Sequence, residues 1–183
     1  MAAKYLHYTY DQLNTFCMDA FQKFGFSESE ARIISDVLLL SDLYGIESHG
    51  MQRLVRYHKG IEKGMIDVHA KPEIVHETPV SAVIDAHDAM GQLVSHQAME
   101  LAIEKAKKTG MAIVSVRNSN HFGIAGYYAK MACDQGLVGM AMTNSEAIMV
   151  PTYARMAMIG SNPIALAVPA EPYPFFFDAS TTV

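Results

Sequence analysis

The hydrophobic periodicity of the chain changes near Val68, and this change limits the folds that are available to it. Before Val68, apolar residues recur every three or four positions, which is typical of amphipathic helices. After it, short apolar runs alternate with helical patterns, which predicts a sheet of strands connected by helices. We therefore expect an α/β protein in which a helical N-terminal region, residues 1–67, precedes a sheet domain over residues 68–183.

Two capping boxes predict where the first helices begin. Thr9 with Gln12 and Ser27 with Glu30 each place a hydroxyl three positions before a side chain that can bond back to the cap. A third helix is expected from about Gly50 to Glu62.

The second part of the chain predicts further helices at about 93–108 and 125–134. The expected strands are Val80–Asp85, Met111–Val116, Leu137–Thr143, Ile164–Val168 and Phe175–Asp178. Because its run is short and apolar, Met111–Val116 is interpreted as a buried strand. The polar segment Arg117–Gly123 is interpreted as a loop.

The composition excludes several classes of protein. Half of the residues are apolar and 18% are charged, which supports a sizeable core. A net charge of −5 without a Lys/Arg cluster argues against nucleic-acid binding. No apolar run is long enough to cross a bilayer, and Met1–Tyr10 does not resemble a signal peptide. The isolated Cys17 and Cys133 indicate buried thiols in a reducing compartment, so we expect a cytoplasmic protein.

The segment Glu47–Tyr57 is the first candidate site. On a helix, His49, Arg53 and Tyr57 would lie at i, i+4 and i+8 and share one face. An imidazole there could move a proton while the guanidinium holds a carboxylate with two hydrogen bonds. The same spacing also fits an exposed helix with ordinary surface charges.

Polar segments after predicted strands form two further candidates. Asn118–Gly123 follows a strand, and His121 could act there as an acid or base, or only cap the next helix. Thr143–Glu146 and Gly160–Pro163 carry hydroxyl and amide groups that suit a ribose or a phosphate. They suit plain turns equally well.

Several nucleotide and catalytic motifs are absent from the sequence. It contains no GxGxxG, no P-loop, and no GxSxG, HExxH or CxxC pattern. The Asp85–Asp88 cluster is explained by a turn after a strand, and we expect no metal site. A metal-dependent hydrolase or lyase with His49 and His121 as ligands stays an alternative, although no carboxylate lies at matching spacing.

Taken together, four ordered segments resemble the malate/L-lactate dehydrogenase family, which is distinct from the Rossmann-type lactate and malate dehydrogenases. The segments are Gly45–Gly50 with Arg53 and Tyr57, Asn118–Gly123 with Ala125–Tyr128, Gly160–Ala165, and Phe177–Thr181. The resemblance covers nearly the whole chain in the right order.

This resemblance implies a non-Rossmann nucleotide-binding fold and the NAD- or NADP-dependent interconversion of small 2-oxo and 2-hydroxy acids. It also implies a homodimer and a chain about twice as long, so the apolar end at Pro174–Val183 is interpreted as a truncation. The sheet domain would then be the first part of an NAD(P)-binding domain. Reduction of cyclic imines, or ligand binding without catalysis, is the alternative.

The family's functional residues match particular positions of this sequence. His49 and His121 match its two active-site histidines, and Ser48 and Arg53 match its substrate-side residues. The resemblance assigns nucleotide contacts to Ser145 and to Asp178, Ala179 and Ser180. Glu146 and Arg155–Ala157 depart from the pattern that is usual in the family.

Overall fold

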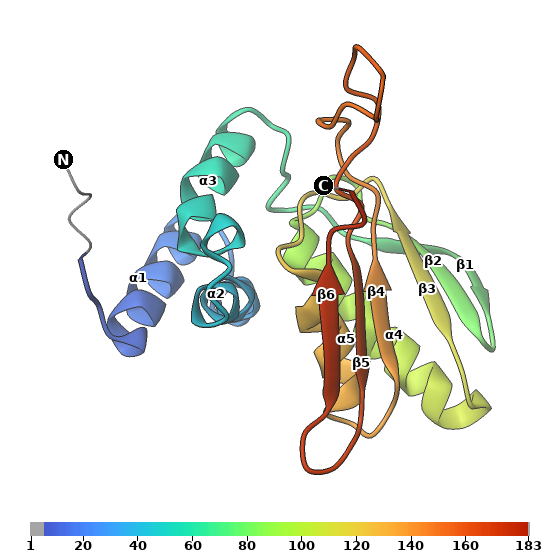
Figure 1. Ribbon diagram of the computed structural model, residues 1–183. Helices are drawn as coiled ribbons and strands as arrows, with labels where there is room; N and C mark the ends of the chain where they lie inside the picture. The colour runs from blue at the N-terminus through green and yellow to red at the C-terminus, as the bar shows by residue number, and fades with distance from the viewer. Residues whose placement is uncertain (1–5, 183) are drawn as a thin grey trace. The chain divides into compact units, whose positions relative to one another are not determined.

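The computed structural model describes residues 6–182, which form two compact units (Figure 1). The first unit contains the chain up to Glu73 together with Asp85–Val94 and Arg117–Gly123. The second contains Ile74–Ile84, Ser95–Val116 and the chain from Ile124 onward. None of the helices within residues 6–182 combines the length and the apolar character that crossing a membrane would need.

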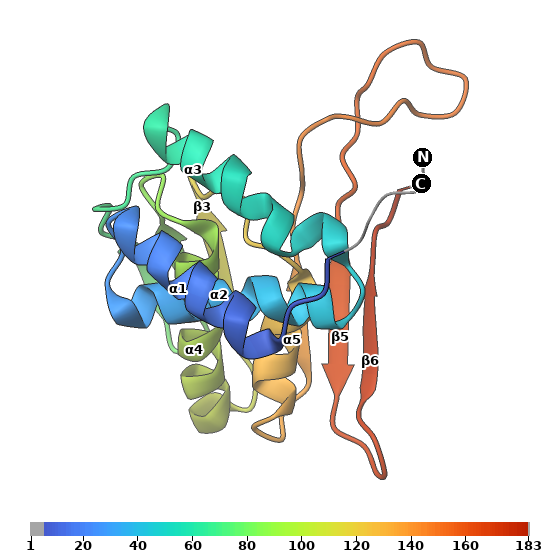
Figure 2. The same cartoon turned by 90° about the vertical axis from the view of Figure 1, so that its left-hand side faces the viewer.

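Helices dominate the first unit, and their starts confirm the capping boxes. Helix α1 (Tyr10–Lys23) begins after Thr9, and α2 (Glu28–Leu43) begins after Ser27, with both reciprocal hydrogen bonds of each box present. The two helices pack side by side (Figure 2). Their apolar faces bury the core residues Phe21, Ile34 and Leu38 completely.

The third helix begins later than the sequence predicts. Helix α3 spans Leu54–Glu62, and two 3₁₀ turns precede it, η1 (Glu47–His49) and η2 (Met51–Arg53). Between the turns, Gly50 is extended, and the Asp42 carboxylate accepts a hydrogen bond of 2.8 Å from the N–H of Met51. The prediction that His49, Arg53 and Tyr57 share the face of one continuous helix is therefore wrong.

The first of two three-stranded sheets has the order β1-β2-β3. Its strands are β1 (Glu73–Thr78), β2 (Ser81–Asp85) and β3 (Ile113–Arg117). Strand β1 was not predicted. The predicted strand at Met111–Val116 exists, but it is not buried, because β3 lies at the edge and Ile113 is 64% exposed. Helix α4 (Gly91–Thr109) is joined to this sheet by an ion pair of 2.7 Å between Lys105 and Glu77.

The second sheet is antiparallel and carries a helix on one face (Figure 1). It contains β4 (Gly139–Met142), β5 (Ile164–Val168) and β6 (Phe175–Ala179), and α5 (Ala125–Cys133) packs against it. Small residues make the close approach possible, since Ala165 and Ala167 are fully buried and a Cβ at Gly139 would overlap the α5 backbone. Cys17 and Cys133 are buried free thiols.

The turn at Gly50 gives a test of the local structure that places His49. A Cβ at Gly50 would overlap the Asp42 carboxylate, so Gly50→Ala should cost about 1–3 kcal/mol of unfolding free energy, as overpacking typically does. Urea unfolding measures this loss. In an Asp42→Ala background the carboxylate is gone, and the same substitution should cost much less. Equal costs in both backgrounds would contradict the steric account.

Candidate active site

Hydrogen bonds from two asparagines hold the loop that carries His121. The buried Asp85 carboxylate accepts from the Asn118 side chain at 3.0 and 3.1 Å and from Arg117 Nε at 2.8 Å. These hydrogen bonds lower the pKa of Asp85, and the bond from Asn118 has the largest effect. The Asn120 amide donates to the carbonyls of Met65, Asp88 and Ala89. The side chains of Asn118 and Asn120 therefore hold the loop in place, and none of these hydrogen bonds uses the side chain of His121.

His121 lies among three groups of the first unit. Its Nδ1 is 2.8 Å from the hydroxyl of Tyr57, and the N–H of Gly123 donates to the same nitrogen at 3.3 Å. The imidazole of His49 stacks on its ring with the centroids 5.3 Å apart and the planes 30° apart. The structure thus brings together the two histidines that the sequence singled out. Tyr57, which the sequence predicted only to share a helix face with His49 and Arg53, contacts His121 directly.

The surroundings of His121 keep its ring neutral. Burial lowers the pKa of His121 to about 3, and the positive charges of His49, Arg53 and Arg56 act in the same direction. The folded protein therefore disfavours the charged form of His121 at neutral pH.

Ser48 and Arg53 lie beside His49 on the two 3₁₀ turns. The Ser48 hydroxyl is 2.9 Å from Nδ1 of His49, which fixes the orientation of that ring. Arg53 donates from Nε to the carbonyl of Ser48. Its two terminal nitrogens have no hydrogen bond or ion pair within residues 6–182, and they are the atoms that a bidentate carboxylate needs.

The residues expected to contact a nucleotide belong to the second unit, and two of them meet at Ser161. The Ser145 hydroxyl is 3.1 Å from that of Ser161, and Ser180 donates to the Ser161 carbonyl at 3.0 Å. The Ser145 N–H donates to the Asn162 side chain, and a Cβ at Gly160 would overlap Ser145. These hydroxyl and amide groups at the end of the β4-β5-β6 sheet are donors of the kind that a ribose or a phosphate accepts.

Asp178 and Ala179 have structural contacts in strand β6. The Asp178 carboxylate accepts a hydrogen bond of 2.7 Å from the N–H of Gly126, in the first turn of α5. An anionic side chain stabilises a helix at this end. Ala179 pairs with Ile164 in the ladder. Asp178 therefore caps a helix whose own N-cap residue, Ile124, offers no side-chain acceptor.

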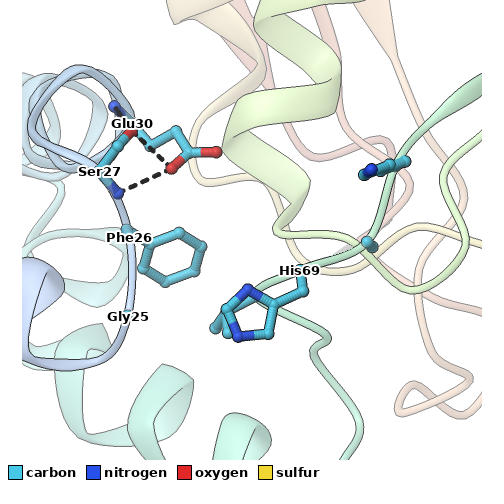
Figure 3. A pocket seen from close by; sticks show the side chains of 8 residues that line it. Gly25, Phe26, Ser27, Glu30 and His69 are labelled. Carbon is cyan, nitrogen blue, oxygen red and sulfur yellow. Dashed lines mark hydrogen bonds between the residues drawn. The ribbon is translucent and has the colours of Figure 1, made fainter.

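A separate cavity of about 520 Å³ lies in the first unit, beside the loop between α1 and α2 (Figure 3). Gly25–Ser27, Glu30 and Val68–Lys71 line it, and none of the predicted site residues does. Glu30 accepts hydrogen bonds from the N–H and the hydroxyl of Ser27 at 2.8 and 2.6 Å. The N-terminus of α2 is thus capped by its own helix, and this cavity is not the candidate active site.

Comparisons with known proteins identify the family of this chain. The sequence profile described as "Malate/L-lactate dehydrogenase" matches residues 8–183. A malate dehydrogenase of Pyrococcus abyssi is 48% identical over 98% of this chain and 49% of its own length. An L-sulfolactate dehydrogenase of Methanocaldococcus jannaschii is 43% identical over 90% of this chain and 48% of its own. The structure of the Pyrococcus horikoshii malate dehydrogenase superimposes with a TM-score of 0.95 and 46% identity, over 98% of this chain and 51% of that one.

The chain therefore belongs to the malate/L-lactate dehydrogenase family. It spans about half the length of the relatives it matches.

The neutral state of His121 predicts a loss of stability in acid. An unfolded histidine has its ordinary pKa of 6.5, whereas burial lowers the folded value to about 3. Between these values the unfolded chain binds a proton that the folded chain does not, so stability falls as the pH falls. The slope from this group is at most about 1.4 kcal/mol per pH unit.

Urea unfolding of the wild type and of His121→Asn, at about pH 7 and about pH 4.5, measures this slope. The wild type should lose more unfolding free energy on acidification than the variant does. The same loss in both proteins would show that His121 titrates normally.

Proposed function

We propose that this chain carries the substrate-binding groups of an NAD- or NADP-dependent dehydrogenase that interconverts small 2-oxo and 2-hydroxy acids. The stacked His49–His121 pair, beside the unpaired terminal nitrogens of Arg53, is the observation that carries the proposal. To reduce a 2-oxo acid, a protein must supply a proton donor, a hydrogen-bond donor and a group that holds the carboxylate.

In the reduction, His49 gives its proton to the oxygen of the substrate carbonyl. His121, which stays neutral, donates a hydrogen bond to the same oxygen. Arg53 holds the substrate carboxylate, and Ser48 keeps the ring of His49 in place. The nicotinamide, when bound, supplies the hydride. In the second unit, Ser145 and Ser180 are the residues that we expect to hold the nucleotide.

We further propose that the preferred substrate carries a second anionic group. Malate and sulfolactate, which appear in the names of the relatives, each have one. Arg56 is exposed, its positive charge acts on His121, and it forms no ion pair within residues 6–182. Arg53 would hold the carboxylate next to the carbonyl, and Arg56 would hold the second anion.

An absorbance assay of NADH and NADPH oxidation by the complete polypeptide that contains these residues tests this function, with oxaloacetate and pyruvate as substrates. Oxaloacetate should be reduced with the higher kcat/KM. Arg56→Gln should lower that preference by about tenfold, the worth of one charged hydrogen bond. Arg53→Lys keeps the charge but loses the planar grip, and it should cost both substrates about 2–4 kcal/mol in kcat/KM. Failure to oxidise either cofactor with any 2-oxo acid would contradict the proposed function.

The roles of the two histidines can be separated by asparagine, which donates a hydrogen bond but releases no proton near neutral pH. His49→Asn should lose about 10²- to 10⁴-fold in kcat, the usual contribution of a positioned acid, and its acidic-side pH profile should become flat. His121→Asn should mainly raise KM and keep a titrating profile. The reverse pattern would transfer the proton to His121.

A further inference from the structure

The hydrogen bonds at Nδ1 of His121 determine where that ring carries its hydrogen. The N–H of Gly123 can only donate, and it donates to Nδ1. A nitrogen that accepts from a backbone N–H presents its lone pair and carries no hydrogen of its own. A neutral imidazole then has its one hydrogen on Nε2.

The Tyr57 hydroxyl, 2.8 Å from the same nitrogen, must therefore donate as well. Its surroundings favour this direction. The side chain is 1% exposed, so its hydrogen cannot turn to solvent. Burial also raises the pKa of Tyr57 to about 12, so the hydroxyl keeps its hydrogen and is available as a donor.

Gln92 is a buried amide close to Tyr57. Within residues 6–182, neither its amide nitrogen nor its oxygen completes a hydrogen bond, although the side chain is fully buried. A buried amide without a partner costs about 1–3 kcal/mol. An aliphatic side chain at this position beside Tyr57 would avoid that cost.

We propose that Tyr57 is a positioning residue that fixes the tautomer of His121, so that Nε2–H is a permanent hydrogen-bond donor and the ring cannot accept a proton at that atom. Nε2 has no partner within residues 6–182, and it is the only ring nitrogen left to meet a substrate. A substrate oxygen that accepts a hydrogen bond suits it, whereas a substrate N–H or O–H donor does not. This use of Nε2–H rests on the proposed dehydrogenase function, but the tautomer itself does not.

Nitrogen-15 NMR of the histidine side chains in the 183-residue protein tests the proposal directly. In the wild type at neutral pH, the His121 signals should show a protonated Nε2 and an unprotonated Nδ1. Tyr57→Phe keeps the ring in the core but removes the donor. The Nδ1 signal should then move downfield, toward the position of an unbonded nitrogen, because hydrogen-bond donation moves this signal upfield.

Tyr128→Phe is the matched control, because it removes the hydroxyl of a buried tyrosine that belongs to the other unit. It should leave both His121 signals unchanged, and a loss of packing alone would not move Nδ1 in this direction. A protonated Nδ1 in the wild type, or an Nδ1 signal unaffected by Tyr57→Phe, would overturn the proposal. The expected NMR result combined with no turnover of 2-oxo acids by the complete polypeptide would refute the proposed function and leave the tautomer assignment intact.

Discussion

The hydrogen bond between the Tyr57 hydroxyl and Nδ1 of His121 joins two parts of the chain that are 64 positions apart. Tyr57 belongs to the core between the N-terminal helices, and His121 belongs to the loop after β3. Through this bond the helical core determines the orientation of a ring in a loop. The stack of His49 on the same ring then brings the Glu47–Arg53 turns into the site.

Two different kinds of constraint keep His121 in its position and its ring neutral. Asp85, Asn118 and Asn120 fix the backbone of the loop through hydrogen bonds to side chains and carbonyls. Burial and the nearby guanidinium of Arg53 suppress the charged form of the ring. The same arrangement reduces stability in acid, because the unfolded histidine is free to bind a proton. A cost of this kind is common at functional sites, where groups are arranged for their chemistry rather than for maximum stability.

Local signals made much of the fold and the candidate site predictable from the sequence. The boxes at Thr9 and Ser27 are short-range hydrogen-bond patterns, and they placed α1 and α2 correctly. The grouping of His49 with His121 needed the family motifs, because no local pattern shows that residues so far apart are in contact.

The features that the sequence did not predict depend on contacts between residues that are distant in the chain or in different elements. The break at Gly50 depends on the carboxylate of Asp42, eight residues earlier, which no periodicity reveals. The exposure of Ile113 depends on the place of β3 at the edge of its sheet. The hydrogen bond from Gly126 to Asp178 spans 52 positions, so the capping of α5 could not be foreseen either.

We propose that His121 is held neutral beside His49 and acts as a hydrogen-bond donor rather than as the acid. The most direct test of this state is to follow the 1H–13C NMR signals of the His121 ring from about pH 8 to about pH 4. An unperturbed histidine titrates within this range, near pH 6.5. We expect the His121 ring signals to stay at their neutral positions throughout. A midpoint near the ordinary value would contradict the account, because His121 would then be free to act as the acid itself.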